Sequence, residues 1–291
     1  MAYLKQSLVP CFHPGFWIKT ALHLLTPGGY GYIRKLRKMQ DAAYVHERDK
    51  HEVRKKHHGE GGWKSEKDGD VLKRDYASYE EYVTHQKQKL DEMLKMKGGF
   101  SNWDICEYRL KFYSRFKHLQ GLLPKDAMIV CCGARQGTEV EVLHDLGYRN
   151  AYGIDLNPGP DNRIVREGDF MKLAAPDNSL DLLYTNCVDH SFDLDAMISE
   201  HARALKPDGF LLYDMGINME KGAGGPFEAV SWDRTEDLVV QLLGKFEKLI
   251  QAERDENFGG QWLWVLLQKK RENRSSASSS CGTRIVLSGS Q

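Results

Sequence analysis

The stretch Met128–Val140, which reads MIVCCGARQGTEV, decides the fold of this 291-residue chain. An apolar run ends in a turn that contains Gly133 and Gly137, and an amphipathic helical pattern begins directly after it. A second short apolar run, Ala151–Asp155, ends in an acid. In such a strand–turn–helix–strand unit, the turn lets backbone amides approach a ligand, and Asp155 can accept hydrogen bonds from ribose hydroxyls. The segment therefore predicts a nucleotide-binding sheet and leaves the nucleotide open.

Downstream of this unit, short apolar runs and helical patterns keep alternating. This alternation predicts a parallel sheet with helices on both faces, and therefore an α/β fold. The final two runs are joined by Glu256–Gly260, which is too short for a crossover helix, so we expect an antiparallel hairpin. The expected strands are Ile164–Asp169, Leu180–Asn186, Phe210–Asp214, Ile250–Asp255 and Gln261–Gln268, and the expected helices are Leu194–Leu205 and Thr235–Leu249.

The chain outside the sheet divides by composition into further parts. Residues 1–60 carry eleven Lys and Arg against five Asp and Glu, and we expect a basic helical arm there. Residues 61–75 are polar and glycine-rich, which is typical of a linker. Residues 76–124 show helical spacing and are expected to form a helical cap that leads into the core domain at 125–270. Seven serines and little apolar periodicity predict a disordered serine-rich tail over residues 271–291.

Composition also bounds the class of protein. Lys plus Arg and Asp plus Glu both number 41, so no nucleic-acid partner is expected. The basic arm is expected to pack on the main domain, and peripheral contact with an anionic membrane stays open as the alternative. Six cysteines without a CxxC pair indicate reduced thiols rather than disulfides or zinc. No apolar run suits a signal peptide or a membrane span, which predicts a soluble, cytoplasmic protein; its oligomeric state is left open.

From residue 125 to about residue 270 the chain resembles the class I S-adenosylmethionine-dependent methyltransferases, most closely their type 11 small-molecule group. The resemblance implies a Rossmann-like seven-stranded sheet in the order 3-2-1-4-5-7-6 with the last strand antiparallel. It also implies S-adenosyl-L-methionine as cofactor and methyl transfer to a small-molecule or glycan-like acceptor. The motifs that carry it, in chain order, are Gly133–Gly137, Asp155, Gly168–Phe170, Ser179–Tyr184, Asp189-His190 and Ala204–Gly209.

The same resemblance implies which residues bind the cofactor. Two positions depart from the family pattern, because Cys131 stands where an acid is usual and Arg135 where the central glycine is usual. Glu139 is a candidate substitute for the acid. Arg135 is a candidate bidentate donor to the cofactor's carboxylate, with a solvent-facing side chain as the alternative. The implied cofactor-binding residues are Gly133, Arg135, Gly137, Glu139, Asp155, Leu156, Asp169, Phe170 and Asn186.

Candidate catalytic residues follow the fourth strand, at the carboxyl edge where open α/β sheets bind ligands. Asn186, Asp189 and His190 lie there. Methyl transfer depends mainly on alignment and on exclusion of water, and it requires a general base only for a hydroxyl or a protonated amine. His190 is the first candidate base because a histidine pKa lies near neutrality, and Asp189 is the second. A wall or capping role for His190 stays open.

Two other functions remain as alternatives. The altered glycine turn is compatible with a catalytically inactive relative that uses the sheet as a binding or scaffold module. An NAD(P)-dependent oxidoreductase would need glycines where Arg135 and Thr138 stand, so it is disfavoured. The acidic residues of the loops do not form the clustered ligand set of a metal-dependent methyltransferase, and no metal is expected.

Overall fold

The computed structural model describes residues 63–65, 71–97, 102–159, 161–216, 227–232, 234–255 and 262–270. The basic arm predicted for residues 1–60 and the tail predicted for residues 271–291 lie outside the described residues. Across the described parts of the chain, no helix is long and apolar enough to cross a membrane.

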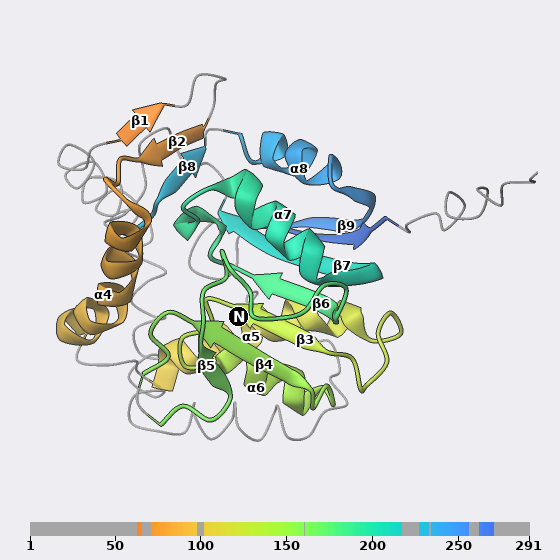
Figure 1. The fold of residues 1–291 in the computed structure, drawn as a ribbon. Coiled ribbons are helices and arrows are strands. Elements are labelled where there is room, and N and C mark those ends of the chain that lie inside the picture. The colour runs from red at the N-terminus through yellow and green to blue at the C-terminus, as the bar shows by residue number, and fades with distance from the viewer. Residues whose placement is uncertain are drawn as a thin grey trace, which may run out of the picture.

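A seven-stranded sheet occupies the centre of the fold, in the order β5-β4-β3-β6-β7-β10-β9 (Figure 1). Numbered along the chain within this sheet, the order is 3-2-1-4-5-7-6, and β10 runs antiparallel to both of its neighbours. The prediction of a Rossmann-like α/β fold is therefore confirmed. The strands are β3 (Ile129–Cys132), β4 (Ala151–Asp155), β5 (Val165–Glu167), β6 (Leu180–Thr185), β7 (Leu205–Gly216), β9 (Phe246–Asp255) and β10 (Trp262–Lys269).

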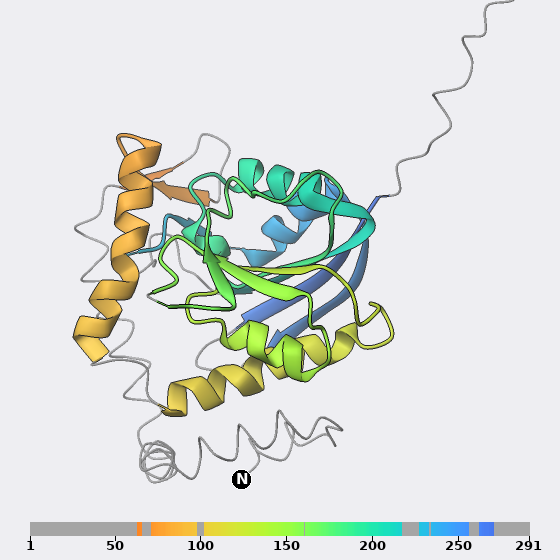
Figure 2. The ribbon, with the colours of Figure 1, turned by 60° about the horizontal axis from the view of Figure 1, so that its bottom comes forward.

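Helices cover both faces of this sheet, as Figure 2 shows. On one face, α5 (Asn102–Phe116) and α6 (Thr138–Asp145) bury an apolar cluster that includes Phe116 and Leu143. On the other, α7 (Leu194–Ala204) and α8 (Thr235–Leu243) bury a second cluster. Every residue of β3 is buried, as expected for a central parallel strand that is covered on both sides.

The helix α4 (Tyr79–Lys97) stands apart from these two layers, at the edge of the sheet where β3, β4 and β6 end (Figures 1 and 2). Beside it, β1 (Trp63–Ser65), β2 (Val71–Arg74) and β8 (Val230–Trp232) form a small antiparallel sheet. Residues 61–75, expected as a plain linker, therefore contain two strands. The pairing partner of β2 lies far along the chain, so local polarity did not reveal the strands.

Two further boundaries differ from the sequence-based expectation. The helix expected to run to Leu249 ends at Leu243, where Gly244 follows, and glycine is a common helix terminator. The next strand accordingly begins at Phe246, which pairs with the end of β10, rather than at Ile250. The strand β7 begins at Leu205 rather than at Phe210, with an irregular pairing to β6 between Leu180 and Leu182.

A buried charge network ties α5 to β7 and β9. The Asp214 carboxylate lies 3.2 Å from Lys111 Nζ and 3.3 Å from Arg115 Nε, and Arg115 also pairs with Asp255. The four side chains are between 0% and 9% exposed. The Lys111 ammonium additionally lies 3.2 Å from the centre of the Trp262 ring, a cation–π contact. Two cations thus face two carboxylates, and the network fixes α5 on the sheet.

Candidate functional site

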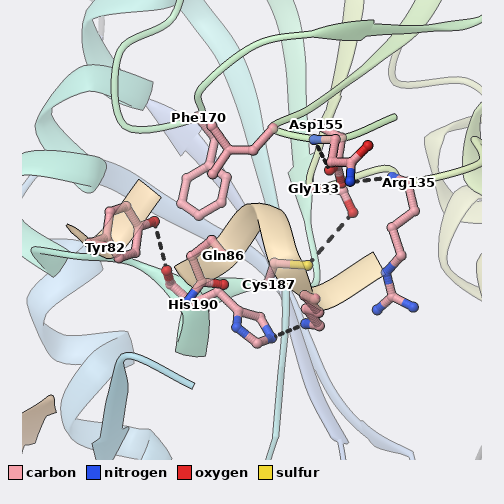
Figure 3. Close-up of a pocket in the computed structure, with 11 residues that line it drawn as sticks. Tyr82, Gln86, Gly133, Arg135, Asp155, Phe170, Cys187 and His190 are labelled. Carbon is pink, nitrogen blue, oxygen red and sulfur yellow. Dashed lines mark hydrogen bonds between the residues drawn. The ribbon is translucent and has the colours of Figure 1, made fainter. Parts of the chain in front are cut away.

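A cleft of about 500 Å³ opens where β3, β4 and β6 end and α4 covers their edge (Figure 3). A second cavity of about 330 Å³ shares Gly133 and Arg135 with it and extends toward Tyr108 and Phe112 of α5. The cleft is lined by Tyr82, Gln86, Lys89, Gly133, Arg135, Asp155, Leu156, Asn157, Phe170, Cys187 and His190.

The glycine turn has the left-handed backbone that close approach to a ligand requires. Gly133 and Gly137 have φ of 71° and 87°, and a Cβ at Gly137 would lie 2.8 Å from side-chain atoms of Ile164 and Val165. Arg135 also has positive φ, 42°, although it is not glycine. The turn therefore keeps the glycine conformation at Arg135, at a cost of roughly 1–3 kcal/mol in backbone strain.

Asp155 ends β4 and presents its carboxylate in the cleft. One carboxylate oxygen accepts a hydrogen bond from the Arg135 backbone N–H at 2.9 Å, and the other accepts one from the Asn157 N–H at 2.9 Å. These bonds fix the carboxylate, and each oxygen keeps a second lone pair for a ligand hydroxyl. This arrangement fits the predicted role in holding a ribose. Leu156, also predicted, lines the same cleft.

The segment after β5 brings Phe170 into the cleft wall. Its neighbour Asp169 accepts a hydrogen bond from the Met171 backbone N–H at 2.8 Å and another from the Tyr79 hydroxyl of α4. The two predicted residues are thus separated in role: Phe170 contributes an apolar surface to the cleft, and Asp169 anchors the start of α4.

The second cavity gathers the other predicted cofactor residues, Glu139 and Asn186, beside Arg135. Glu139 is buried, and this burial raises the pKa of its carboxyl to about 8. Cys131, which replaces the usual acid, is fully buried in the apolar cluster that underlies α6. Glu139 is therefore the acid that lines this cavity beside the glycine turn. Arg135 lines both cavities instead of extending away from them.

His190 lies in a short 3₁₀ helix, Val188–His190, and its ring has a defined tautomer. Its Nδ1 lies 2.8 Å from the Phe227 carbonyl oxygen and must donate to it. Its Nε2 consequently accepts a hydrogen bond from Lys89 Nζ. Burial lowers the pKa of His190 to about 3. The imidazole is therefore neutral, and the lone pair of its Nε2 accepts the hydrogen bond from Lys89.

The other two residues predicted to act with His190 lie in different places. The Asp189 carboxylate is 3.8 Å from His190 Nε2, and burial raises its pKa. Asn186 lines the second cavity and accepts a hydrogen bond from the Cys187 thiol at 3.3 Å. His190 is the one member of this predicted set that lines the larger cleft.

Sequence reasoning expected a helical cap over residues 76–124 but did not identify which residues of α4 line the cleft. Tyr82, Gln86 and Lys89 lie at positions i, i+4 and i+7 and so share one face of the helix. The Tyr82 hydroxyl donates to the His190 carbonyl oxygen at 2.8 Å, and Gln86 donates to the Phe227 carbonyl oxygen at 2.7 Å. Polar residues at this spacing were the available signal, but the same spacing is common in solvent-exposed helices.

Asp189, His190 and Glu228 also place possible metal-ligand atoms within 4.8 Å of one another. One Glu228 carboxylate oxygen is buried without a hydrogen-bond partner among the described residues. The Lys89 amine contacts His190 Nε2 at this point and interacts electrostatically with Asp189 and Glu228. Lys89 is therefore the partner that His190 Nε2 has here.

Comparison with known proteins gives the following relationships. A family model described as "Methyltransferase domain" matches residues 130–213. No curated protein sequence matches the chain. The 1,6-didemethyltoxoflavin-N1-methyltransferase of Burkholderia thailandensis, solved with 1,6-didemethyltoxoflavin and S-adenosylhomocysteine, is 16% identical with a TM-score of 0.53, covering 71% of this chain and 98% of that one.

Two further solved structures are more distant. An S-adenosylmethionine-dependent methyltransferase from Mesorhizobium loti is 18% identical with a TM-score of 0.41, covering 54% of this chain and 98% of that one. Another such methyltransferase, from Aquifex aeolicus, is 18% identical with a TM-score of 0.43, covering 59% of this chain and 100% of that one. At these identities, structural similarity shows only a shared fold. Of the three structures, only the one from Burkholderia has a TM-score high enough to show a shared fold.

Proposed function

We propose that this chain, which carries a class I S-adenosylmethionine-dependent methyltransferase domain, transfers a methyl group to a small-molecule or glycan-like acceptor bound beneath α4. The observation that carries the proposal is the single cleft that joins the glycine turn, Asp155 and His190 at the carboxyl edge of the sheet. Open α/β sheets bind ligands at this edge. The helix α4 covers the cleft, which suits a reaction that depends on alignment and on exclusion of water.

The residues present fit the cofactor along the whole turn. We assign ribose binding to Asp155, beside Leu156, and an adenine-facing surface to Phe170, with Asp169 next to it. The backbone amides around Gly133 and Gly137 approach the ligand. When bound, S-adenosylmethionine would supply a methyl group on a positively charged sulfur. The sulfur is the group that an acceptor would displace in line from the methyl carbon.

The second cavity suits the methionine end of the cofactor. Arg135 is a planar, permanently charged donor that matches a carboxylate. Glu139 is a buried acid whose pKa of about 8 would fall beside an ammonium group, because a nearby positive charge favours the ionised form. Asn186 provides both an amide donor and an acceptor. Together the three offer the opposite charges that an amino acid moiety requires.

On the acceptor side we propose that His190 lines the place where the methyl group is delivered, with Asp189 beside it and Asn186 on the side of the second cavity. Tyr82 and Gln86 of α4 form the facing wall. The helix α4 covers this cleft, and a covered cleft favours a compact acceptor over a folded macromolecular surface. This is the basis for a small molecule or a terminal sugar as the substrate.

The proposal is tested by isothermal titration calorimetry with S-adenosylhomocysteine, followed by transfer of a radiolabelled methyl group to a panel of phenols, hydroxylated heterocycles and monosaccharides. We expect binding by the wild-type protein and none by Asp155→Ala. An absence of heat at millimolar ligand would refute the proposal. Binding without turnover across the panel would favour an inactive binding module, and heat with NAD(P) in place of S-adenosylhomocysteine would favour an oxidoreductase.

A further inference from the structure

Lys89 enters the cleft from α4, outside the segment that matches the family model. Its side chain is partly buried, and its amine contacts His190 Nε2. Burial and the positive charge of Arg135 lower the pKa of Lys89, whereas Cys187, Asp189 and Glu228 oppose this shift. Together with His190, these are the described charged and titratable groups that act most strongly on the amine. Lys89 is thus an amine placed among the residues where an acceptor would bind.

The surroundings of His190 fix it as a partner of Lys89. Its Nδ1–H is bonded to the Phe227 carbonyl oxygen, which also accepts a hydrogen bond from Gln86. Its own carbonyl oxygen accepts a hydrogen bond from Tyr82. The ring cannot turn its free lone pair elsewhere without breaking the bond between Nδ1 and the Phe227 carbonyl oxygen, so Nε2 is directed at the Lys89 amine. His190 is therefore better suited to hold another base than to accept a proton itself.

We propose that Lys89 is the general base of the methyl transfer and that His190 is the positioning residue that holds its amine. One N–H of the neutral amine is donated to His190 Nε2, which leaves the nitrogen lone pair available to the acceptor. This inference rests on the proposed function. It narrows the acceptor to a group with a removable proton, such as a hydroxyl or an N–H.

The proposed step is balanced as follows. The acceptor heteroatom forms a bond to the methyl carbon while the carbon–sulfur bond breaks and its electron pair passes to sulfur. The proton that the acceptor loses passes to the Lys89 amine, which becomes an ammonium group. Release of that proton to water restores the base for the next cycle.

A readout independent of turnover comes from NMR. In protein labelled with ¹³C-lysine and saturated with S-adenosylhomocysteine, the Lys89 ¹³Cε signal, assigned by its loss in Lys89→Arg, is followed against pH. We expect its midpoint to lie below the free-lysine value of about 10.4. A midpoint at or above that value would overturn the proposal, because the amine would then be charged throughout the working range.

Variants separate a base from a merely positive side chain. Lys89→Gln removes both properties, whereas Lys89→Arg keeps the charge and cannot lose its proton. With an acceptor that turns over in the panel, we expect both variants to lose about 100- to 10,000-fold in rate while S-adenosylhomocysteine binding persists. Lys87→Gln is the matched control, since Lys87 lies on the same helix and pairs with exposed Glu167 at 2.8 Å. It should leave the rate unchanged.

The pH profile distinguishes the base from its positioning residue. The wild-type rate should rise with pH up to the midpoint of Lys89, and His190→Gln should lower the rate and move that midpoint. A Lys89→Arg protein with the wild-type rate would overturn the assignment of Lys89 while leaving the methyltransferase proposal intact. Failure of the wild type to bind S-adenosylhomocysteine would overturn both.

Discussion

The buried charge network beneath α5 yields a strong prediction about stability. Asp214 is fully buried and accepts hydrogen bonds from Arg115 at 3.3 and 3.4 Å, and Lys111 lies 3.2 Å from the same carboxylate. Asp214→Ala would leave two buried cations facing the single carboxylate of Asp255. Removing one partner of a buried ion pair typically costs about 3–5 kcal/mol, because the remaining charge loses its compensation. We expect a loss of this size in the free energy of unfolding.

The same reasoning predicts how the loss can be reversed. The double variant Lys111→Met/Asp214→Leu removes one cation and one carboxylate and leaves Arg115 paired with Asp255. Because replacing a buried pair with apolar side chains is often neutral, the double variant should be more stable than Asp214→Ala alone. Glu167→Ala, which breaks the exposed pair with Lys87, is the matched control and should change stability little.

Equilibrium urea unfolding, followed by circular dichroism, measures these differences through the transition midpoint and slope. The reasoning is refuted if Asp214→Ala unfolds within about 1 kcal/mol of the wild type, the scale of an exposed pair. It is equally refuted if the double variant is no more stable than Asp214→Ala. That outcome would mean that packing around Asp214, rather than uncompensated charge, determines the loss.

Three further predictions concern the glycine turn and its helix. Gly137→Ala should weaken S-adenosylhomocysteine binding in calorimetry and lower the melting temperature, because its Cβ would lie 2.8 Å from atoms of Ile164 and Val165 at a φ of 87°. Arg135→Gly should raise the melting temperature by relieving about 1 kcal/mol or more of strain, yet weaken ligand binding; unchanged binding would remove Arg135 from the site. Burial raises the pKa of Glu139 to about 8, so the contribution of this group to stability is present below about pH 4.5 and is lost as pH rises through 8. In urea unfolding, the stability advantage of Glu139→Gln over the wild type should therefore grow between these two pH values. A stability difference that stays constant with pH would contradict this prediction.

Most of the sheet was predictable because its signals are local. Buried parallel strands are continuous apolar runs, and the glycine turn and Asp155 follow such strands directly. The β1–β2 pair was not predictable, because β2 is completed by β8, more than a hundred residues further along the chain. The role of Asp214 was equally hidden. Its position at the end of an apolar strand is compatible with a pocket, and only the packing of α5 reveals its two cationic partners.

The candidate site shows the same division. Its cofactor side is read from the chain between Gly133 and Phe170, where each residue follows a strand of the sheet. Its acceptor side depends on Lys89, which lies 101 residues from His190 and on a different element. Helical spacing places Lys89 on a face with Tyr82 and Gln86 but says nothing about what that face meets. Motif reasoning therefore could not identify Lys89, the base we propose, whereas it did identify His190, the histidine that holds Lys89.

This separation has a consequence for specificity. The hydrogen bonds of Tyr82, Gln86 and Lys89 go to His190, in the segment after β6, and to Phe227 before β8, both of which lie outside the strands that carry the glycine turn and Asp155. Substitutions on the cleft-facing side of α4 can therefore alter acceptor choice while the cofactor contacts are retained. Gln86→Leu is a direct case, since it removes a donor to the Phe227 carbonyl oxygen. S-adenosylhomocysteine affinity should persist while the ranking of acceptors in the panel changes, and a parallel loss of cofactor affinity would show that the two sides are coupled.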